Sequence, residues 1–541
     1  MKYFLFTLPI AFLTAFYFYP LGAILQTSFA GENARAVGEV FSDPYYARVL
    51  AFTIGQAALS TLLTVLAALP AAFIFARYDF RGATLVRAVT TIPFVMPTIV
   101  VATAFSTLLG PRGSINLALM QLFHLDQPPI RIMHTLTMIL LAHIFYNFTV
   151  VLRIVGGFWS NLDPQLEQAA RVLGASRLRA FWHITLPLLT PALLAAALLV
   201  FIFDFTSFGV ILILGGARLA TLEVEIYRQT VNLFNLPIAA TLSLIQLACT
   251  LVLTLMYTRL QTRLARPLRL RPQAMVRRKL SSAREKILVT LYLAAMMLFL
   301  MTPLVSIVAA SLEDGGSYYA ELFINRRDSI MFVPPIEAVR NSLFFAAATT
   351  VLAVTLGLIA AYSIESRDKR VPAFVRLLDA VYMLPLGTSA VTLGFGFILA
   401  LGSLRASIAL VVIAHSLIAF PFVVRAILPI LRSIAPRLRE AAQMLGASPH
   451  QVWREIDLPI LTRAVLVGAV FAFTISMGEF GATMLVARPD LPTIPLAIYR
   501  VIGQPGLANF GQALALSTIL MLVSALGILA VERLRVGEAE F

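Results

Sequence analysis

The sequence contains one nine-residue motif twice: QAARVLGAS at residues 168–176 and EAAQMLGAS at residues 440–448. The copies are 272 residues apart, and the same spacing relates further matching residues on both sides of them. These matches are Ala142-His143 and Arg153 with Ala414-His415 and Arg425, Ile184 and Leu186-Pro187 with Ile456 and Leu458-Pro459, Phe208-Gly209 with Phe480-Gly481, and Ile226-Tyr227-Arg228 with Ile498-Tyr499-Arg500. A single register over about 85 residues indicates an internal duplication. The chain is therefore predicted to consist of two related halves.

The two halves differ in length upstream of this region. Ile92-Pro93 matches Leu384-Pro385 at a spacing of 292 residues instead of 272. The first half therefore carries about twenty extra residues. Their simplest location is the segment from Gly110 to Arg131.

The composition excludes a soluble enzyme. Apolar residues make up 59% of the 541 positions and charged residues only 13%, whereas an ordinary soluble domain has about 25% charged residues. The single cysteine, Cys249, excludes both a disulfide framework and a Cys-rich zinc site. Folding must therefore depend on the bilayer and on helix packing.

Twelve apolar runs have close to the length of about 20 residues that crosses a bilayer. They cover residues 3–29, 49–76, 88–109, 135–158, 188–214, 237–258, 287–311, 341–364, 378–401, 407–430, 464–487 and 510–531. The first run is longer than the core of a signal peptide, so we interpret it as a retained helix. The sequence predicts an all-α polytopic membrane protein of about 12 transmembrane helices, arranged as two tandem six-helix repeats of the same orientation. The predicted units are residues 1–258, a basic linker at 259–286, and residues 287–541.

The basic residues indicate which side of the membrane each loop faces. Lys and Arg exceed Asp and Glu by 15. With a cytoplasmic N-terminus, the predicted inner segments hold 28 basic residues and the outer segments 12, which agrees with the positive-inside rule. The excess charge is therefore a topology signal, and a nucleic-acid partner is not expected. We expect a multi-pass protein of a bacterial-type plasma (inner) membrane with both termini in the cytoplasm.

The duplicated motif falls in a predicted cytoplasmic loop of each half. Asp163-Pro164 suits the start of a helix, and Gly174 suits its C-terminal turn. A second short helix is predicted over Ser176 to His183, with Leu186-Pro187 as the turn into the next span. The same design is predicted from Ala435-Pro436 to Leu458-Pro459. One such hairpin could simply pack tightly against the protein, but two on the same side favour docking of a partner.

These residues resemble the EAA loop of permease subunits in binding-protein-dependent ABC importers. The matching residues are Glu440, Ala441, Ala442, Gly446, Ile456 and Leu458-Pro459, and in the first half Gln168, Ala169, Ala170, Gly174, Ile184 and Leu186-Pro187. The first copy has Gln168 where the pattern has Glu, so the two docking contacts need not be equally strong. The chain is most similar to the fused, double-length permeases of the iron(III) and thiamine branch. Ser207-Phe208-Gly209, Leu214-Gly215-Gly216, Thr221-Leu222-Glu223, Ile226-Tyr227 and Ala142-His143 with Asn147 are closer to the thiamine permeases.

The resemblance implies a type I ABC importer fold with a pseudo-dimeric pore. Each EAA loop would dock into one of two cytoplasmic ATPase subunits, and an extracytoplasmic solute-binding protein would deliver a small solute, thiamine or ferric iron, to the opposite face. Coupling is thereby assigned to Gln168, Ala169, Ala170, Gly174, Glu440, Ala441, Ala442 and Gly446. ATP and Mg²⁺ would be bound by the partner ATPase and not by this chain.

The chain itself is not expected to be an enzyme. A phosphate-binding P-loop requires Gly followed by Lys and Ser or Thr, and none of the four lysines follows a glycine. No catalytic residue and no metal ligand is assigned, because no Ser, His and Asp set or metal-ligand set clusters outside the predicted spans.

Candidate pathway residues are the polar groups inside the spans, where ionisable side chains are costly and by default functional. Asp204 is predicted to lie deep in the fifth span and Glu479 in the eleventh, where Ser207 occupies the position that matches Glu479. Both carboxylates could flank one cavity and meet a cationic solute. The alternative is that each only accepts hydrogen bonds from its neighbours. For His143 and His415, which are expected to begin matched helices, a capping or interhelical hydrogen bond is favoured over a place in the pathway.

Proline residues suggest where the spans bend. Pro93, Pro97 and Pro385 are predicted to kink the third and ninth spans.

Two rival functions remain. A secondary transporter driven by an ion gradient could also have twelve helices in parallel halves, but it does not explain the duplicated EAA loop. A structural membrane scaffold does not explain carboxylates within the spans.

Overall fold

The computed structural model describes residues 2–264, 277–325, 330–365, 372–404 and 407–536. In the first half the helices are α1 (Lys2–Leu13), α2 (Tyr19–Phe29), α3 (Ala34–Ser42), α4 (Pro44–Arg77), α5 (Ala83–Val95), α6 (Thr98–Leu109), α7 (Ser114–Phe123), α8 (Leu136–Ser160), α9 (Pro164–Val172), α10 (Arg177–Ala180), α11 (Leu186–Phe205), α12 (Gly209–Leu214), α13 (Leu222–Tyr227) and α14 (Leu236–Leu264). In the second half they are α15 (Ala283–Leu312), α16 (Ser317–Glu321), α17 (Ile336–Ile364), α18 (Pro372–Met383), α19 (Ala390–Ala400), α20 (Ala409–Ser433), α21 (Pro436–Met444), α22 (Pro449–Val452), α23 (Leu458–Gly478), α24 (Gly481–Val486), α25 (Ile494–Ile502) and α26 (Leu507–Val536). The described strands, β1 (Tyr78–Asp79) and β2 (Arg278–Lys279), pair in parallel.

The prediction of an all-α membrane protein is confirmed. Within the described residues, ten helical segments are long and apolar enough to cross a membrane, and two bent helix pairs bring the number of possible spans to 12. The bent pairs are α5 with the α6–α7 region, at 102°, and the α18–η6 segment with α19, at 97°. They correspond to the third and ninth predicted spans. Pro93 and Pro97 lie at the first bend, and Pro385 lies in the 3₁₀ turn η6 (Leu384–Gly387) before the second.

The fifth and eleventh spans differ from the prediction. Helix α11 ends at Phe205 and α23 at Gly478, and a short helix follows each break, α12 and α24. The apolar runs continue through both breaks, so hydropathy alone could not reveal them. Asp204 therefore lies in the last turn of α11, and Glu479 lies in the break that follows α23.

The turn predicted at Leu186-Pro187 is wrong. Helix α10, the π-helical turn η3 (Phe181–Thr185) and α11 form one continuous helical segment from Arg177 to Phe205. The second half repeats this design with α22, η8 (Trp453–Asp457) and α23, continuous from Pro449 to Gly478. Each π turn directly precedes a Leu-Pro pair, and the wider turn accommodates a residue that has no backbone N–H to donate.

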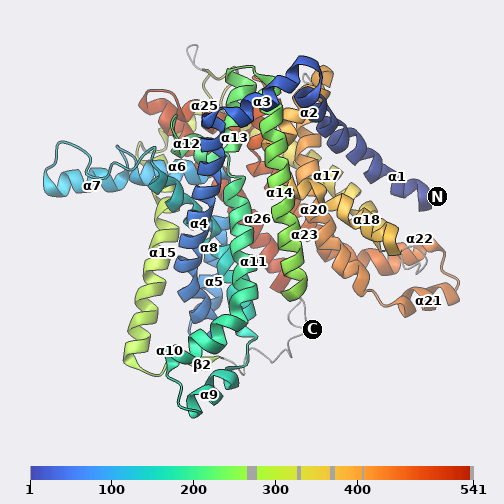
Figure 1. The fold of residues 1–541 in the computed structure, drawn as a ribbon, viewed down its shortest axis with the longest axis horizontal. Helices are drawn as coiled ribbons and strands as arrows, with labels where there is room; N and C mark the ends of the chain where they lie inside the picture. The colour runs from blue at the N-terminus through green and yellow to red at the C-terminus, as the bar shows by residue number, and fades with distance from the viewer. Residues whose placement is uncertain (1, 265–276, 326–329, 366–371, 405–406, 537–541) are drawn as a thin grey trace.

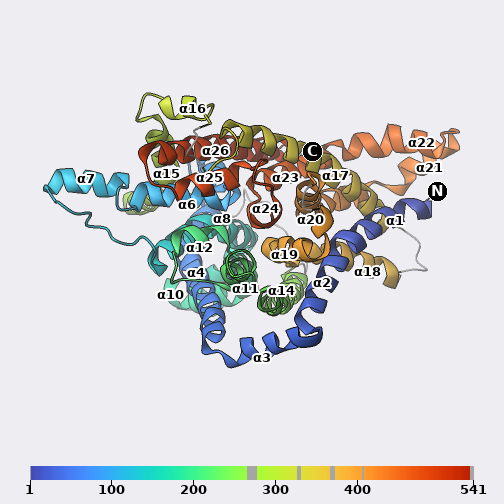
Figure 2. The same ribbon diagram turned by 90° about the horizontal axis from the view of Figure 1, so that it is seen from above.

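The two halves exchange their first helices. Helices α1 and α2 pack against α17 and α19 of the second half, while α15 packs against α5 and α6 of the first half. Hydrogen bonds fix both crossings: the Tyr17 hydroxyl lies 2.7 Å from Thr388 Oγ1, and the Tyr292 hydroxyl donates to the Ala67 carbonyl at 2.6 Å. The halves therefore form one body, and Figure 2 shows α11, α12, α19, α20 and α24 grouped around its centre.

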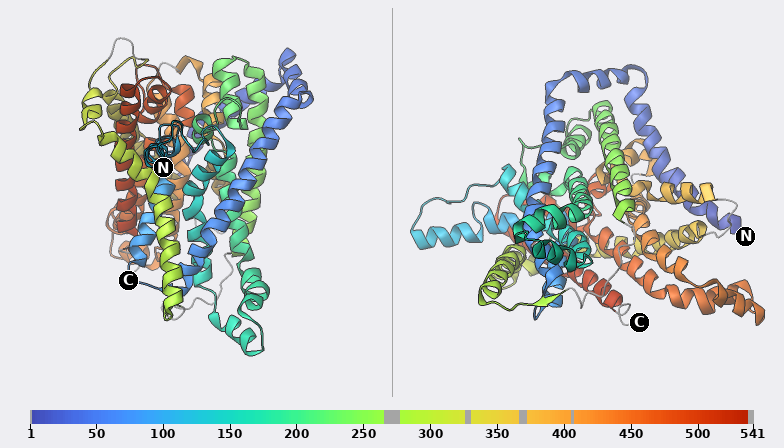
Figure 3. Two further views of the ribbon diagram at one scale, coloured as in Figure 1. Left: turned by 90° about the vertical axis from the view of Figure 1, so that its left-hand side faces the viewer. Right: turned by 60° about the horizontal axis from the view of Figure 1, so that its bottom comes forward.

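The two predicted hairpins project from the body. Helices α9 and α21 contain no buried residue. Both lie towards the lower end of the molecule in Figure 1, whereas α12, α13 and α25 lie at the upper end. Figure 3 shows the same two hairpins extending outward from the helical bundle. We refer below to the hairpin end and the opposite end of the molecule.

Candidate functional site

A cavity of about 410 Å³ lies between the two halves where the broken spans meet. The first half contributes residues from α5, the α5–α6 bend, α8, α11, α12 and α13, and the second half contributes residues from α19, α20, α23 and α24. Four of the five predicted pathway residues line it: His143, Asp204, Ser207 and Glu479. The fifth, His415, is fully buried behind Glu479.

His143 ties together three helical elements of the first half. Its Nδ1 atom lies 3.0 Å from Ser60 Oγ of α4 and 3.4 Å from Asp204 Oδ1, and its Nε2 atom lies 2.9 Å from Ser207 Oγ. The histidine therefore bridges the end of α11 and the segment that follows the break. It lies in the second turn of α8 and not at its start, so its contacts are interhelical bonds and not a cap.

The second half repeats this bridge with the polar residues exchanged. His415 Nδ1 lies 2.7 Å from Ser476 Oγ, and its Nε2 lies 2.8 Å from Thr483 Oγ1 and 3.2 Å from Glu479 Oε2. Ser476 occupies the position that matches Asp204, as Glu479 matches Ser207. Each half thus places one carboxylate and two hydroxyls around its histidine, and at the two matched positions the carboxylate and the hydroxyl are exchanged.

Glu479 also stabilises the break in its span. Its Oε1 atom accepts from the Ala482 backbone N–H at 2.7 Å, and its Oε2 atom accepts from the Thr483 N–H at 2.9 Å. The Thr483 hydroxyl is a further partner. The side chain therefore satisfies the first free N–H groups of α24, which a break inside a membrane protein would otherwise leave exposed.

Asp204 is less completely bonded than Glu479. Its Oδ1 atom accepts from Asn147 Nδ2 at 2.7 Å, and its backbone carbonyl accepts from Gln56 Nε2 at 2.8 Å. Its other carboxylate oxygen, Oδ2, has no hydrogen-bond partner among the described residues, and the same is true of Asn147 Oδ1. Both side chains are about 1% exposed and line the cavity. Two residues of the cavity wall therefore each hold a buried acceptor that lacks a partner among the described residues, and such acceptors suit a group with positive charge or N–H donors.

Aromatic rings line one wall of the cavity. Phe94 lies 6.1 Å from Tyr146 and 6.2 Å from Phe203, measured between ring centroids. Aromatic faces attract cations and also pack against flat rings. The combination of carboxylate, amide and rings suits an organic cation with aromatic character.

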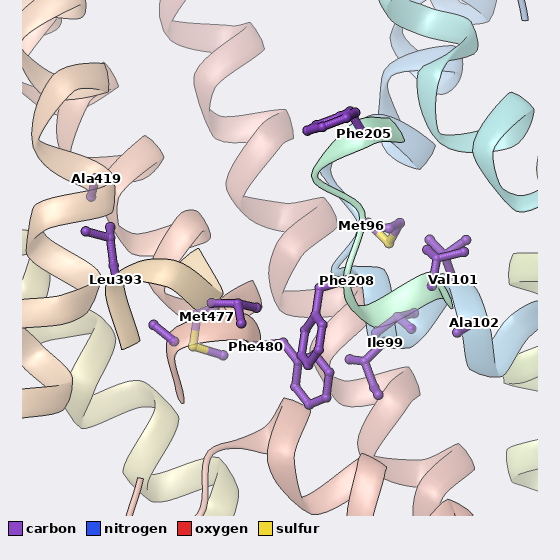
Figure 4. Close-up of a cluster of buried hydrophobic side chains, with 14 of the residues drawn as sticks. Met96, Ile99, Val101, Ala102, Phe205, Phe208, Leu393, Ala419, Met477 and Phe480 are labelled. Carbon is purple, nitrogen blue, oxygen red and sulfur yellow. The ribbon is translucent and has the colours of Figure 1, made fainter. Parts of the chain in front are cut away.

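A second aromatic group separates this cavity from a larger one at the opposite end. The matched residues Phe208 and Phe480 stack at 5.5 Å across the two halves (Figure 4), and Tyr227 and Tyr499 flank them at 5.6 Å each. Tyr499 also lines a cavity of about 750 Å³ beside α12 and α25. These rings therefore lie between the two cavities.

Sequence reasoning missed Glu223 as a residue of the cavity. It is buried in α13, where its Oε2 atom accepts from the Ser389 hydroxyl of the second half at 2.7 Å and its Oε1 atom from Gln246 Nε2 at 2.5 Å. Pro495 occupies the matching position in the second half. The available signal was an acidic residue in an apolar segment, but only the fold shows that it joins the halves.

The glycine of each Phe-Gly pair allows two helices to approach each other closely at the centre of the molecule. A Cβ atom on Gly209 would lie 2.5 Å from Thr98 Oγ1 and 3.2 Å from the ring of Phe480. A Cβ on Gly481 would lie 3.1 Å from Ala390 Cβ. Glycine therefore lets each short helix lie against the start of α6 or α19, the helix that follows each bend.

The two hairpins end in matching glycine turns. Gly174 and Gly446 have φ of +94° and +88°, a conformation that favours glycine. The apolar side chains just before them are almost fully exposed: Leu173 is 88% and Leu445 90% exposed. Of the predicted coupling residues, Gln168, Ala169, Glu440 and Ala441 are exposed and Ala170 and Ala442 are partly buried. The predicted N-cap is also present, because Asp163 Oδ1 accepts from the Gln165 N–H at 3.0 Å.

The second hairpin is anchored to the body by ion pairs. Arg439 of α21 lies 2.7 Å from Asp457 Oδ1 and 3.1 Å from Glu365 Oε1, and the Tyr362 hydroxyl donates to Asp457 Oδ2 at 3.2 Å. Burial alone would lower the pKa of the Arg439 guanidinium, but its bonds with the two carboxylates raise the pKa above its usual value, so it remains charged. Glu167 and Thr185 occupy the positions that match Arg439 and Asp457 in the first half. This pair of contacts is therefore not repeated there.

Comparison with known proteins identifies relatives over both halves. The model of a family described as "Binding-protein-dependent transport system inner membrane component" matches residues 65–266 and again residues 353–535. The chain is 27% identical over 477 residues to "Thiamine transport system permease protein ThiP" of Escherichia coli (strain K12), covering 86% of this chain and 85% of the relative. It is 28% identical over 524 residues to the protein of the same name from Brucella abortus (strain 2308), covering 92% and 91%.

Shorter relatives match half of the chain. A "Putative 2-aminoethylphosphonate transport system permease protein PhnU" of Salmonella typhi is 26% identical over 254 residues, covering 46% of this chain and 88% of the relative. A solved bacterial ABC transporter involved in the import of the acidic polysaccharide alginate matches with 19% identity and a TM-score of 0.41. That match covers 48% of this chain and 95% of the solved chain.

Proposed function

This chain belongs to the family of binding-protein-dependent transport system inner membrane components, and from that premise we propose that it forms the complete pore of an ATP-driven importer for thiamine. It is a fused, double-length permease of the ABC importer type and a transport component instead of an enzyme. The proposal adds the solute, the energy source and the orientation in the membrane.

The observation that carries the ATP coupling is the pair of matched hairpins. Leu173 and Leu445 are exposed apolar side chains at equivalent turns, and exposed apolar groups rimmed by polar residues mark docking sites. Two copies of one ATPase subunit would each take one hairpin and would hold the ATP and Mg²⁺. Their closure would move α11 and α23, which continue directly from the hairpins to the cavity.

The observation that supports thiamine is the central cavity. Thiamine is a flat, aromatic organic cation with an exocyclic amine, and Asp204 and Asn147 line the same cavity as the aromatic rings of Phe94, Tyr146 and Phe203. A cavity of about 410 Å³ is within the usual range for small-molecule sites. For the ferric iron alternative, the described residues contain no group of three or more His, Cys, Asp or Glu placed to hold a metal ion. The thiamine-transport names of the full-length relatives agree with this choice.

The proposed orientation places the hairpin end and both termini in the cytoplasm. An extracytoplasmic binding protein would then release thiamine at the opposite end, beside the cavity of about 750 Å³. The stacked Phe208 and Phe480 rings line the central cavity, and Tyr499, which packs against Phe480, lines the larger one. An ion-gradient transporter remains the rival, and it gives the two exposed hairpins no role.

Labelling of single cysteines tests this orientation. After replacement of Cys249 by Ala, cysteines at Ser282 and Ser448 should be shielded from an impermeant thiol reagent in intact cells, and one at Ser317 should react. All three serines are exposed in the fold, so access depends on the side of the membrane and not on burial. All three should react after the cells are opened. Reaction of the Ser448 position from outside would contradict both the topology and the docking role of the hairpin.

A further inference from the structure

Helix α7 (Ser114–Phe123) projects sideways from the bundle. Figures 1 and 2 both show it extending away from the centre, where α11, α12 and α24 lie. It belongs to the connection of residues 110–135 between α6 and α8, whereas residues 401–408 alone connect α19 to α20. The shorter connection has no room for a helix of this length, so α7 is a feature of the first half only.

The base of this projection is fixed by hydrogen bonds. Asn116, a buried residue of α7, donates from Nδ2 to the Gly110 carbonyl at 2.8 Å and to the Ile130 carbonyl at 2.9 Å. Its Oδ1 atom accepts from the Ile130 N–H at 2.9 Å. Ser114 Oγ lies 3.2 Å from Ser306 Oγ of α15. These contacts close the loop at its base and hold the start of α7 against α15.

The contact with α15 gives the depth of α7 in the membrane. Helix α15 starts at the hairpin end and has no charged residue between Lys286 and Glu313. Ser306 lies 20 residues beyond Lys286, which is about 30 Å along the helix. That length equals the thickness of the hydrocarbon core of a bilayer. Helix α7 therefore leaves the bundle at the boundary between acyl chains and headgroups, on the side opposite the hairpins.

The surface of α7 is apolar over most of its circumference. The helix contains no Asp, Glu, Lys or Arg, and Leu122 is 70% and Phe123 61% exposed. Its exposed polar side chains, Ser114 and Gln121, lie seven residues apart and therefore share one face. A helix with so little polar surface is stable only where an apolar environment covers it.

We propose that α7 is an interfacial helix whose apolar surface is covered by the acyl chains of the leaflet at the end opposite the hairpins. Interfacial helices lie in the plane of the membrane with their apolar face buried about 5–10 Å into the boundary of headgroups and acyl chains. The exposed side chains Leu298 and Val305 give α15 an apolar outer surface, and α7 continues this surface at the depth of that boundary. Because α7 points away from the central cavity, lipid and not the other half of the bundle surrounds it.

The accessibility of spin labels on single cysteines tests this placement. The full chain with Cys249→Ala is studied alone in lipid nanodiscs, with a label at Phe123→Cys or at Gln121→Cys, two exposed positions on opposite faces of α7. Oxygen concentrates among acyl chains and a nickel chelate stays in water, so the ratio of the two accessibilities reports depth. We expect this ratio to be roughly fivefold or more higher at Phe123→Cys than at Gln121→Cys.

Two exposed leucines provide the reference values. Leu173→Cys at the tip of the first hairpin sets the value for water, and Leu298→Cys in the middle of α15 sets the value for acyl chains. The ratio at Phe123→Cys should lie nearer to that of Leu298→Cys. Leu122→Asp should shift it towards that of Leu173→Cys without changing the unfolding temperature, because a carboxylate is costly among acyl chains.

Two results would overturn the proposal. A ratio at Phe123→Cys as low as that of Leu173→Cys would place α7 in water. A label that is in water in the chain alone, and that loses contact with both reagents only after the binding protein is added, would assign the apolar surface to a protein partner. None of these measurements requires transport or the ATPase, so they can fail independently of the proposed function.

Discussion

Asp204→Asn is expected to reduce thiamine uptake roughly 10- to 100-fold at low solute concentration while the amount of protein in the membrane stays unchanged. The amide keeps the shape of the side chain and an oxygen that can accept from Asn147 Nδ2. It replaces the other carboxylate oxygen, which is buried without a partner among the described residues, by an NH₂ group that cannot accept a hydrogen bond and carries no negative charge. A hydrogen bond to a charged group contributes about 1.5–3 kcal/mol, and about 1.4 kcal/mol corresponds to a tenfold change in affinity. Uptake of labelled thiamine and immunoblotting of membranes measure the two quantities.

Ser476→Ala is the matched control for this variant. Ser476 occupies the position equivalent to Asp204, and its hydroxyl bonds to His415 behind the cavity. Loss of this hydroxyl should lower the stability of the folded protein more than it lowers the affinity for the solute. If Asp204→Asn transports thiamine like wild type, or if Ser476→Ala lowers solute affinity to the same degree, Asp204 does not recognise the solute.

Leu445→Asp in the second hairpin is expected to abolish ATP-driven uptake and to reduce retention of the ATPase at least tenfold. The side chain is 90% exposed, so the change removes little packing within the chain and should not unfold it. A desolvated carboxylate in an apolar docking pocket is costly for the complex. Leu173→Asp should do the same in the first hairpin, where the residue is 88% exposed. Gly446→Asp and Gly174→Asp should weaken docking too, because both glycines have positive φ.

Co-purification of the ATPase with each variant measures this effect directly. Arg284→Asp, which changes an exposed residue outside both hairpins, should retain the ATPase at the wild-type level. Normal ATPase retention and normal uptake in both leucine variants would show that the hairpin tips do not dock the ATPase. Because only the second hairpin has the Arg439 anchor, comparison of the two leucine variants also reveals whether the docking sites are equivalent.

Much of the architecture could be predicted because the chain repeats itself. Apolar runs of bilayer length predicted the spans, and the register between Gly174 and Gly446 predicted two hairpins of one design. The breaks after Phe205 and Gly478 could not be predicted from hydropathy, because the backbone changes direction while the side chains stay apolar. The π turns before Leu186 and Leu458 were missed for a similar reason: proline suggested an interruption, but a wider helical turn accommodates it.

The candidate site was predictable in its residue types but not in its bonding. Asp204 and Glu479 stood out as acids within apolar runs. Only the fold shows that Glu479 accepts two backbone N–H groups of α24 while one oxygen of Asp204 is buried without a partner among the described residues. Such differences depend on which neighbours reach each oxygen across the bundle. Glu223 illustrates the same point, because its partner Ser389 lies 166 residues away.

Uptake of labelled thiamine into proteoliposomes tests the proposed transport most directly. The vesicles would contain this chain and its ATPase, with the binding protein and thiamine outside, ATP and Mg²⁺ on the ATPase side, and ionophores to collapse every ion gradient. We expect thiamine to accumulate only when ATP, the ATPase and the binding protein are all present, and we expect no accumulation with Leu445→Asp. Accumulation driven by an imposed ion gradient in vesicles that contain this chain alone would contradict the proposal and favour a secondary transporter.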